Sequence, residues 1–353
     1  MSKCVTVYTQ AYNVENYIEQ CIKSVLSQTF QDFEWILVEN GSTDKTREII
    51  RKYAALDERI KPDYFDVNQD GFTNYYIAEK ADGRYIVKID SDDWIEPEYL
   101  EKLIAPFEDP DVDISICGAV NYEEETGRET PHEYGELDGV YSKSDIEKQF
   151  IEMRSYMGTY WGKMFRREIF CSILPDMKEI GEKLKKGDNF GGDVAFALCY
   201  LGECKKLAFV NERMYHYRIH NNSYATRTIG TNRVFSCLAL RETEHHFLHK
   251  VNAYTEQNVI MVDLLFWQNI EQLFKNIIRA DWDTDQKIKT ISEVCANKDL
   301  QLLRKEAYNS KVRTILMGDI AWCYMNAGNS KYLKNVLMLL EPDIFDSISN
   351  ETY

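Results

Sequence analysis

Short apolar runs alternate with helical stretches along the first 120 residues, and this alternation constrains the fold more than any other feature. Runs rich in β-forming residues occupy positions 4–8, 33–38, 60–65, 85–89 and 112–120. Stretches with the apolar spacing of helices lie between them, at positions 13–26, 42–55, 71–83 and 97–107. Alternating strands and helices are typical of a parallel sheet that is covered by helices. The sequence therefore predicts an α/β fold.

The character of the sequence changes after about residue 228. Glycines and strand-like runs become rare, and amphipathic helical stretches dominate from Arg233 onward. We expect an α/β domain of residues 1–228 followed by a mostly helical domain of residues 229–353. Several aromatic residues of this region are interpreted as helix-packing residues, namely Phe266, Trp267, Phe274, Trp282 and Trp322. Three histidines are interpreted as an exposed helix face, namely His245, His246 and His249.

The composition argues against one class of partner and favours one compartment. The chain has 42 Lys and Arg residues against 58 Asp and Glu residues, which gives a net charge of −16 at pH 7. Nucleic acid is a poor partner for such a chain, because phosphate binding needs clustered basic residues. The nine cysteines are widely spread and form no Cys-x-x-Cys pair, which is typical of reduced thiols. We therefore expect no nucleic-acid partner and a cytoplasmic location.

On the sequence alone we expect neither export nor a membrane span. The first residues lack the long apolar segment of a secretion signal. No window approaches the ~20 apolar residues that a bilayer-spanning helix needs. Peripheral association with the inner face of a membrane stays open.

Three carboxylates, those of Asp90, Asp92 and Asp93, lie within four residues directly after the apolar run 85–89. Like charges at this spacing repel each other unless a cation or hydrogen-bond donors offset them. Mg²⁺ and Mn²⁺ prefer carboxylate oxygens and usually share their coordination shell with substrate phosphates. Open α/β sheets bind ligands at the carboxyl ends of their strands. The segment therefore predicts a divalent-metal site, with an Asp-rich turn that caps the next helix as the alternative.

Four motifs in a fixed order carry a resemblance to a known family. They are Tyr12-Asn13, SVLSQTF at residues 24–30, VENGSTD at residues 38–44 and DSDDWIEP at residues 90–97. This ordered set resembles the inverting family 2 glycosyltransferases of the GT-A fold over roughly residues 4–225. The resemblance implies a Rossmann-like mixed sheet flanked by helices. It also implies transfer of a sugar from a nucleotide-diphosphate sugar, with a UDP-sugar favoured, to a hydroxyl of a glycan or lipid-linked glycan in surface polysaccharide synthesis.

The resemblance also assigns roles to the residues of these motifs. Asp93 would coordinate the Mn²⁺ or Mg²⁺ ion that bridges the donor diphosphate, and Asp92 would contact the ribose or share the metal. The ion would neutralise charge on the departing diphosphate. The nucleotide base would pack against the loop after the first strand, formed by Thr9, Gln10, Ala11 and Tyr12. An ordinary strand-to-helix turn is the alternative for this loop.

Two positions depart from the family pattern. The family usually has Asp-Asp-Gly-Ser where this chain has Glu39-Asn40-Gly41-Ser42, and the second Asp commonly accepts a hydrogen bond from uracil. Asn40 can accept this bond but is uncharged and can also donate, so the base preference stays open, and Asn40 and Ser42 are assigned to the nucleotide site. The Ala-Arg-Asn run of many members is absent from residues 71–78. Lys163 or Arg218 would then serve the diphosphate, unless this contact is dispensable.

Asp193 is the expected catalytic base. It follows Gly191 and Gly192 in a segment that resembles the family's Glu-Asp or Gly-Asp motif at a helix start. In an inverting transfer, one carboxylate removes the proton of the acceptor hydroxyl while that oxygen attacks the anomeric carbon. A helix N-cap is the alternative role for this residue.

The acceptor side of the site is assigned by the same resemblance. Trp161 lies in a segment that lines this side in the family, and a tryptophan of the core is the alternative. His216, Arg218 and His220 resemble a basic loop over the diphosphate, with a solvated turn as the alternative. The helical region after residue 228 would serve acceptor binding, membrane association or homo-oligomer formation.

Two other functions are kept as alternatives. A sugar nucleotidyltransferase would carry a Gly-rich loop with Lys or Arg directly after the first strand, and residues 9–13 do not have this composition. A nucleotide-sugar binding protein that lost catalysis is favoured by Asn40 and by the missing arginine. The joint presence of Asp92, Asp93 and Asp193 argues against it.

Overall fold

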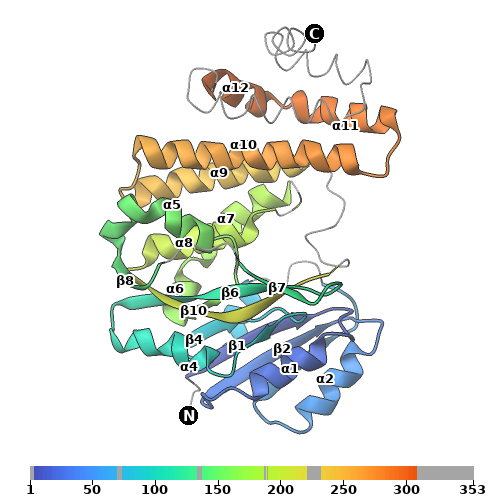
Figure 1. Ribbon diagram of the computed structural model, residues 1–353, viewed down its shortest axis with the longest axis vertical. Helices are drawn as coiled ribbons and strands as arrows, with labels where there is room; N and C mark the ends of the chain where they lie inside the picture. Colours follow the sequence, from blue (N-terminus) through green and yellow to red (C-terminus); the bar gives the residue numbers. More distant parts are fainter. Residues whose placement is uncertain are drawn as a thin grey trace. The chain divides into compact units, whose positions relative to one another are not determined.

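The computed structural model describes residues 4–69, 74–132, 137–186, 188, 190–220 and 232–307. The chain forms two compact units (Figure 1). The first unit comprises residues 1–178, 196–223 and 251–253, and the second comprises residues 179–195, 224–250 and 254–353. The division of the chain at residue 228 stays a prediction.

The first unit is built on a mixed sheet. Its strands are β1 (Val5–Ala11), β2 (Phe33–Asn40), β3 (Ile60–Phe65), β4 (Tyr85–Lys88), β5 (Trp94–Ile95), β6 (Val112–Glu123), β7 (Arg128–Pro131), β8 (Gly139–Ser142), β9 (Lys163–Arg166) and β10 (Lys206–Ile219). In the described part of the chain the main path of the sheet runs β3-β2-β1-β4-β9-β6-β10-β5. The strands β3, β2, β1 and β4 are parallel, whereas β9 runs antiparallel to both β4 and β6. The predicted α/β fold with a mixed sheet is confirmed.

Helices flank this sheet and dominate the end of the described chain. The helices up to residue 203 are α1 (Ile18–Leu26), α2 (Thr46–Ala54), α3 (Asn74–Lys80), α4 (Tyr99–Ile104), α5 (Ile146–Tyr156), α6 (Arg167–Ser172), α7 (Leu174–Lys185) and α8 (Gly192–Glu203). They are followed by α9 (Arg233–Lys250), α10 (Glu256–Arg279), α11 (Thr284–Cys295) and α12 (Lys298–Ala307). Short 3-10 turns lie at Ala105–Glu108 and Lys143–Asp145. The predicted helical character after Arg233 is confirmed for the described residues.

Alternation along the strands sorts their side chains onto two faces of the sheet. One face carries a core of alternate strand residues, including Val5, Val7, Trp35, Leu37, Tyr85, Val87 and Ile89. The apolar side of α1 packs on this core through Ile18, Cys21, Ile22 and Val25. Because these residues repeat at helical spacing, one side of α1 is fully buried. The same strands direct their other residues, such as Tyr8 and Lys88, to the opposite face.

The first helix begins later than the sequence predicts. Asn13 is expected at the helix start, but its backbone has a φ of 53°, and α1 begins at Ile18. The Asn13 side-chain oxygen accepts a hydrogen bond from Thr43 N at 2.8 Å. Asn13 N donates in turn to Ser42 Oγ at 3.1 Å. Asn13 therefore ties the loop after β1 to the loop after β2 instead of capping α1.

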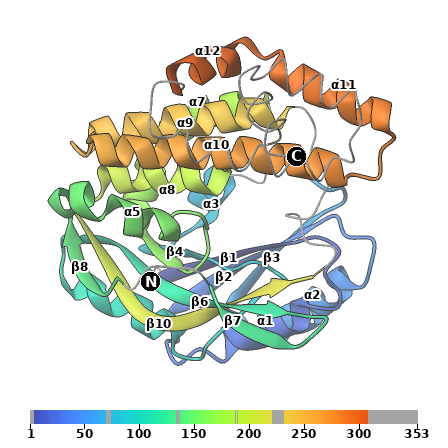
Figure 2. The same cartoon turned by 45° about the horizontal axis from the view of Figure 1, so that its top comes forward.

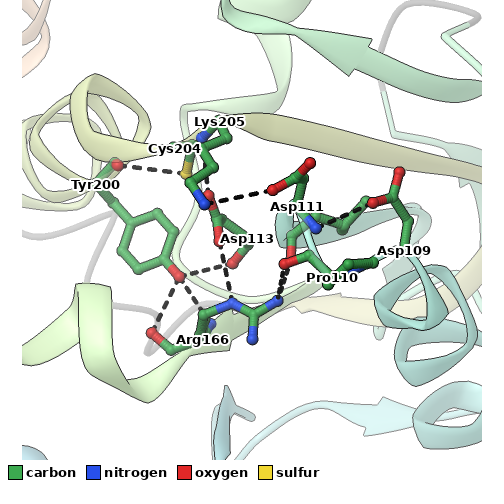
Figure 3. Close-up of polar contacts among 9 residues, drawn as sticks. Asp109, Pro110, Asp111, Asp113, Arg166, Tyr200, Cys204 and Lys205 are labelled. Atoms are coloured by element: carbon green, nitrogen blue, oxygen red, sulfur yellow. Dashed lines mark hydrogen bonds and ion pairs between the residues drawn. The ribbon is translucent and has the colours of Figure 1, made fainter.

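A buried ion pair fixes β9 within the sheet (Figure 3). Arg166 Nε donates to Asp113 Oδ1 at 3.0 Å, and Arg166 Nη2 donates to Val112 O at 2.6 Å. The other Asp113 oxygen accepts from Lys205 N at 2.8 Å. Tyr200 of α8 donates its hydroxyl to Asp113 O at 2.7 Å and accepts from Arg166 N at 2.7 Å. One network thus joins β6, β9, α8 and the start of β10.

The second unit has its own apolar core. Its buried residues are Val234, Cys237, Phe266, Ile270, Leu273, Ile277, Ile291, Val294 and Leu300. Trp267, Phe274 and Trp282 pack against this core, as the sequence predicts, and Trp322 lies outside the described residues. His245 differs from the expected exposed face, because its Nε2 lies 3.3 Å from Asp263 Oδ1 of α10. His246 and His249 are exposed. Among the described helices, none is long and apolar enough to cross a lipid bilayer.

Replacing Arg166 with Met should lower the free energy of unfolding by about 3 kcal/mol, because the buried Asp113 carboxylate then lacks its counter-charge. Urea unfolding followed by circular dichroism measures the change. The matched control is Lys205→Met, because the Lys205 ammonium pairs with Asp111 at the surface, at 3.3 Å. That variant should change stability by less than about 1 kcal/mol. Equal losses in both variants would contradict this account of the network.

Candidate active site

The acidic segment lies at the edge of the sheet where three parallel strands end. β4 ends at Lys88, and Ile89 N continues the ladder by donating to Tyr8 O of β1 at 2.9 Å. The chain then turns through residues 90–93 before β5. β1 and β2 end at Ala11 and Asn40, at the same edge. The acidic turn, the loop after β1 and the loop after β2 therefore share the carboxyl edge of the sheet.

Asp93 is the buried member of the acidic turn. Its Oδ2 accepts a hydrogen bond from Tyr215 Oη at 2.7 Å, and its Oδ1 accepts from Arg218 N at 2.8 Å. Burial raises the pKa of Asp93 well above its usual range, and the charges of Asp92 and Asp90 raise it further. Both carboxylate oxygens thus face donors of β10. Asp93 joins the acidic turn to that strand.

Asp90 and Asp92 reach the surface of the site. Their side chains are 33% and 27% exposed, respectively, whereas Asp93 is 1% exposed. Asp90 Oδ1 lies 2.9 Å from Lys88 Nζ. Asp92 Oδ2 lies 3.0 Å from His220 Nε2. These two carboxylates are therefore accessible from solvent at this edge.

Arg218 is hydrogen-bonded to the acidic turn through both its backbone and its side chain. Its Nε donates to Asp92 O at 2.8 Å, and its Nη2 donates to Gln20 Oε1 at 2.6 Å. Its guanidinium lies 4.8 Å from the ring centroid of Trp94 and 5.0 Å from that of Tyr17. The planar cation is held between aromatic rings, a favourable arrangement for a buried arginine. The solvated turn considered for this segment is therefore wrong at Arg218.

Lys163 and Trp161 are packed inside the first unit. Lys163 Nζ donates to Thr159 O at 2.6 Å, Thr159 Oγ1 at 2.9 Å and Trp161 O at 3.2 Å. An ammonium group has three N–H donors, so these contacts match its capacity. The Trp161 ring stacks on Tyr215, with centroids 4.5 Å apart and planes at 6°. Trp161 therefore supports the tyrosine whose hydroxyl holds Asp93.

The predicted nucleotide loop combines buried and exposed residues. Thr9 and Ala11 are buried, and Thr9 Oγ1 accepts from Trp35 Nε1 at 3.1 Å. Gln10 is half-buried, and Tyr12 is exposed beside the Asn13 turn. Ser42 Oγ accepts a hydrogen bond from Asn13 N in that turn, as described above. The structure therefore brings the loop after β1 and Ser42 together.

Asn40 makes its hydrogen bonds within the chain. Its Nδ2 donates to Asn68 Oδ1 at 2.8 Å, and its Oδ1 accepts from Gln69 N at 2.9 Å. The neighbouring Gly41 has a φ of 76°, and a Cβ atom there would lie 2.4 Å from the Val67 carbonyl carbon. Only glycine fits this contact. Asn40 and Gly41 thus hold residues 67–69 against the end of β2.

Asp193 lies in the first turn of α8, which begins at Gly192. Its side chain is exposed. The residue before the helix is Gly191, with a φ of 78°, so Asp193 occupies a helical position and not the N-cap. Asp193 belongs to the second unit. Its role as the catalytic base stays a prediction.

The donor atoms of the acidic turn fit a divalent ion that shares its coordination with a ligand. Within the described ranges, no three His, Cys, Asp or Glu side chains gather into a ready-made metal cluster. Mg²⁺ is commonly held by one or two carboxylates together with substrate phosphates. The exposed carboxylates of Asp92 and Asp90 fit this mode. Asp93 fits it less well, because both of its oxygens already accept hydrogen bonds.

Two contributors to the site are not apparent from the sequence patterns above. Tyr215 holds Asp93 and accepts a hydrogen bond from Asp90 N at 3.0 Å. Lys88 pairs with Asp90, and its signal is a lysine within the otherwise apolar run 85–89. The signal for Tyr215 is the alternation of Tyr215 and Tyr217 with His216 and Arg218. Such alternation is typical of a strand with one face on the core.

The mixed sheet flanked by helices has the GT-A fold. Residues 1–349 of TarS from S. aureus, in a crystal structure with UDP-GlcNAc, have this fold, with a TM-score of 0.59 and 16% sequence identity. That match covers 99% of this chain and 93% of the TarS chain.

Sequence relatives identify the family. The glycosyl transferase family 2 model matches residues 6–174. EpsH of Bacillus subtilis (strain 168), which is named as a glycosyltransferase, is 31% identical to this chain over 305 residues. The alignment covers 84% of this chain and 84% of EpsH. The glycosyltransferase GlyA of Streptococcus pneumoniae serotype 4 is 29% identical over 227 residues, 62% of this chain and 31% of GlyA. The chain belongs to glycosyl transferase family 2 and is a glycosyltransferase.

Replacing Tyr215 with Phe should lower the free energy of unfolding by about 1–3 kcal/mol, because the buried Asp93 carboxylate loses a donor. Tyr8→Phe is the matched control, since the buried Tyr8 hydroxyl has no hydrogen-bond partner in the part of the chain that the structure describes. That variant should be at least as stable as the wild type. Thermal and urea unfolding measure both. A Tyr215→Phe protein with wild-type stability would show that the hydroxyl does not support Asp93.

Proposed function

We propose that this glycosyltransferase moves a sugar from a nucleotide-diphosphate sugar, with a UDP-sugar favoured, to a hydroxyl of a glycan or lipid-linked glycan. The observation that carries the proposal is the acidic turn, which is hydrogen-bonded to β10 and presents Asp90 and Asp92 at the carboxyl edge of the sheet. Membership of the family supports it, and so does the similarity in fold to TarS, whose structure contains UDP-GlcNAc. The proposed setting is surface polysaccharide synthesis at the cytoplasmic face of a membrane.

We place the metal ligand at Asp92, with Asp90 as the second carboxylate within reach. Asp93, the ligand predicted from the sequence, would act instead as the buried support of the turn, because both of its oxygens face β10. When bound, Mn²⁺ or Mg²⁺ would supply Lewis-acid stabilisation of the diphosphate leaving group. The side chains of β10 would keep the turn in one geometry while the donor binds. Such preorganisation is a main source of electrostatic catalysis.

The nucleoside would bind over the loop after β1. The exposed Tyr12 ring would stack on the base. The hydrogen bonds between the loops at Asn13 and Ser42 would hold the Tyr12 loop in place. Aromatic stacking tolerates any base, so it does not select uracil. Because Asn40 is engaged with Asn68 and Gln69, we propose that it shapes this pocket through the 67–69 segment.

The transfer itself would invert the anomeric carbon, with Asp193 as the base. An exposed carboxylate in the first turn of a helix can accept the proton of an acceptor hydroxyl. The acceptor, the contribution of the C-terminal helices to its binding and their part in a homo-oligomer stay predictions.

Asp92→Asn should lower kcat/KM about a hundredfold or more, because loss of a metal ligand removes several kcal/mol of transition-state stabilisation. Its thermal stability should stay that of the wild type. The assay incubates protein and Mn²⁺ with UDP-, GDP- and CDP-sugars and measures the released nucleoside diphosphate. EDTA should abolish the release, and added Mn²⁺ should restore it.

Asp93→Asn is the companion variant in the same assay. It should lose about 1–3 kcal/mol of stability, because an amide N–H group would face a donor of β10. An inactive Asp93→Asn protein with wild-type stability, beside an active Asp92→Asn protein, would move the metal to Asp93. If the wild type binds and turns over none of the donors, the proposed activity is wrong.

A further inference from the structure

Lys88 places a positive charge beside the acidic turn. It is the last residue of β4, and its Nζ lies 2.9 Å from Asp90 Oδ1. Its neighbours Val87 and Ile89 are buried in the core on the other face of the sheet. The aliphatic stem of Lys88 therefore runs away from that core, and the ammonium lies 5.2 Å from the ring centroid of Tyr160. The position combines an ion pair with a cation–π contact.

Exposure distinguishes Lys88 from the other cations considered for the diphosphate. Its side chain is 24% exposed, whereas Arg218 is 7% exposed and Lys163 is 1% exposed. Arg218 and Lys163 use their donors to hold the backbone of neighbouring turns. Of these three cations, Lys88 is the one that pairs with a carboxylate of the acidic turn and also reaches solvent.

A second observation points to a ligand at the same place. Tyr8 of β1 pairs in register with Lys88, so the two side chains stand next to each other on one face of the sheet. The Tyr8 side chain is 2% exposed, and its hydroxyl has no hydrogen-bond partner among the described residues. Burial raises the pKa of this hydroxyl. The positive charge of Lys88 lowers that pKa and the negative charge of Asp90 raises it, so both groups lie close enough to act on the hydroxyl. A buried hydroxyl without a partner costs free energy unless a ligand satisfies it.

We infer that Lys88 is a catalytic residue that contacts the diphosphate of the donor, and that the Tyr8 hydroxyl donates to an oxygen of the same ligand. The inference rests on the proposed function. Lys88 would replace the arginine that the family pattern has in the segment of residues 71–78 and that this chain lacks. Tyr160 connects Lys88 to the helix of that segment, since its ring lies 5.2 Å from the Lys88 ammonium and its Oη donates to Asn74 Oδ1 of α3 at 3.0 Å.

The chemistry of the transfer explains why a cation belongs there. The acceptor oxygen forms a bond to the anomeric carbon while the bond from that carbon to the β-phosphate oxygen breaks. The electron pair of the broken bond stays on the phosphate oxygen, and the hydroxyl proton passes to the base. Negative charge therefore grows on the diphosphate as it leaves. The Lys88 ammonium stabilises that charge more strongly in the transition state than in the bound donor.

The test compares binding of a nucleoside diphosphate with binding of the monophosphate of the same base. Calorimetry with Mn²⁺ is carried out on the wild type, Lys88→Met, Lys88→Arg and Tyr8→Phe. Lys88→Met should weaken diphosphate binding about tenfold to a hundredfold, as expected for a lost charge-assisted hydrogen bond. Monophosphate binding should not change. Lys88→Arg should recover most of the affinity. Tyr8→Phe should bind the nucleotide-diphosphate sugar more weakly, with a thermal stability at least that of the wild type.

Lys102→Met is the control for the change in net charge, because Lys102 pairs with Glu212 at the surface, at 2.7 Å. It should bind both nucleotides as the wild type does. Wild-type diphosphate affinity in Lys88→Met would overturn the inference and leave the proposed function intact. Equal loss of monophosphate and diphosphate binding would overturn it as well, because Lys88 would then act only through Asp90 or the fold. If the wild type binds neither nucleotide, the proposed function fails, and this inference fails with it.

Discussion

The hydrogen bonds from β10 to Asp93 are the interaction on which the rest of the site depends. Three carboxylates within four residues repel each other, and burying one of them costs free energy unless donors surround it. Tyr215 Oη and Arg218 N provide those donors, at 2.7 Å and 2.8 Å. With Asp93 held inside, the turn can present Asp90 and Asp92 outward. The buried carboxylate therefore sets the geometry of the exposed ones.

The form of β10 follows from this role. The strand pairs in parallel with β6 and in antiparallel with β5, and the two strands β6 and β10 run side by side (Figure 2). Its register shifts between Val210 and Arg213 and again between Arg213 and Tyr215. Such irregularities re-aim side chains and are frequent next to active sites. Beyond them, Tyr215 stacks on Trp161, and the Arg218 guanidinium packs on the rings of Tyr17 and Trp94. These contacts hold both side chains in position next to the turn.

The sequence predicts the first half of the sheet well, because β1 to β4 and β6 carry apolar runs whose length and spacing are local properties. It also places the acidic turn at the end of a strand.

The sequence does not identify β10 as a strand, because the segment after Val210 is rich in polar side chains that serve the site. The hydrogen-bond partners of Asp93 and Arg218 are not apparent from the sequence, for the same reason. These hydrogen-bond partners lie more than 120 residues away along the chain, as between Asp93 and Tyr215. Lys163 resembles a ligand-binding lysine in sequence, but its acceptors are two backbone oxygens and the Thr159 hydroxyl, in a turn that the pattern does not reveal.

The central claim is that Asp92, at the surface of a turn held by Asp93, binds a divalent ion together with the donor diphosphate. Electron paramagnetic resonance of Mn²⁺, titrated into the protein with and without a nucleoside diphosphate, tests it most directly. The account predicts tight Mn²⁺ binding in the wild type only when the diphosphate is present, and loss of that binding in Asp92→Asn. Mn²⁺ binding that does not depend on the diphosphate, or that survives in Asp92→Asn, would contradict it.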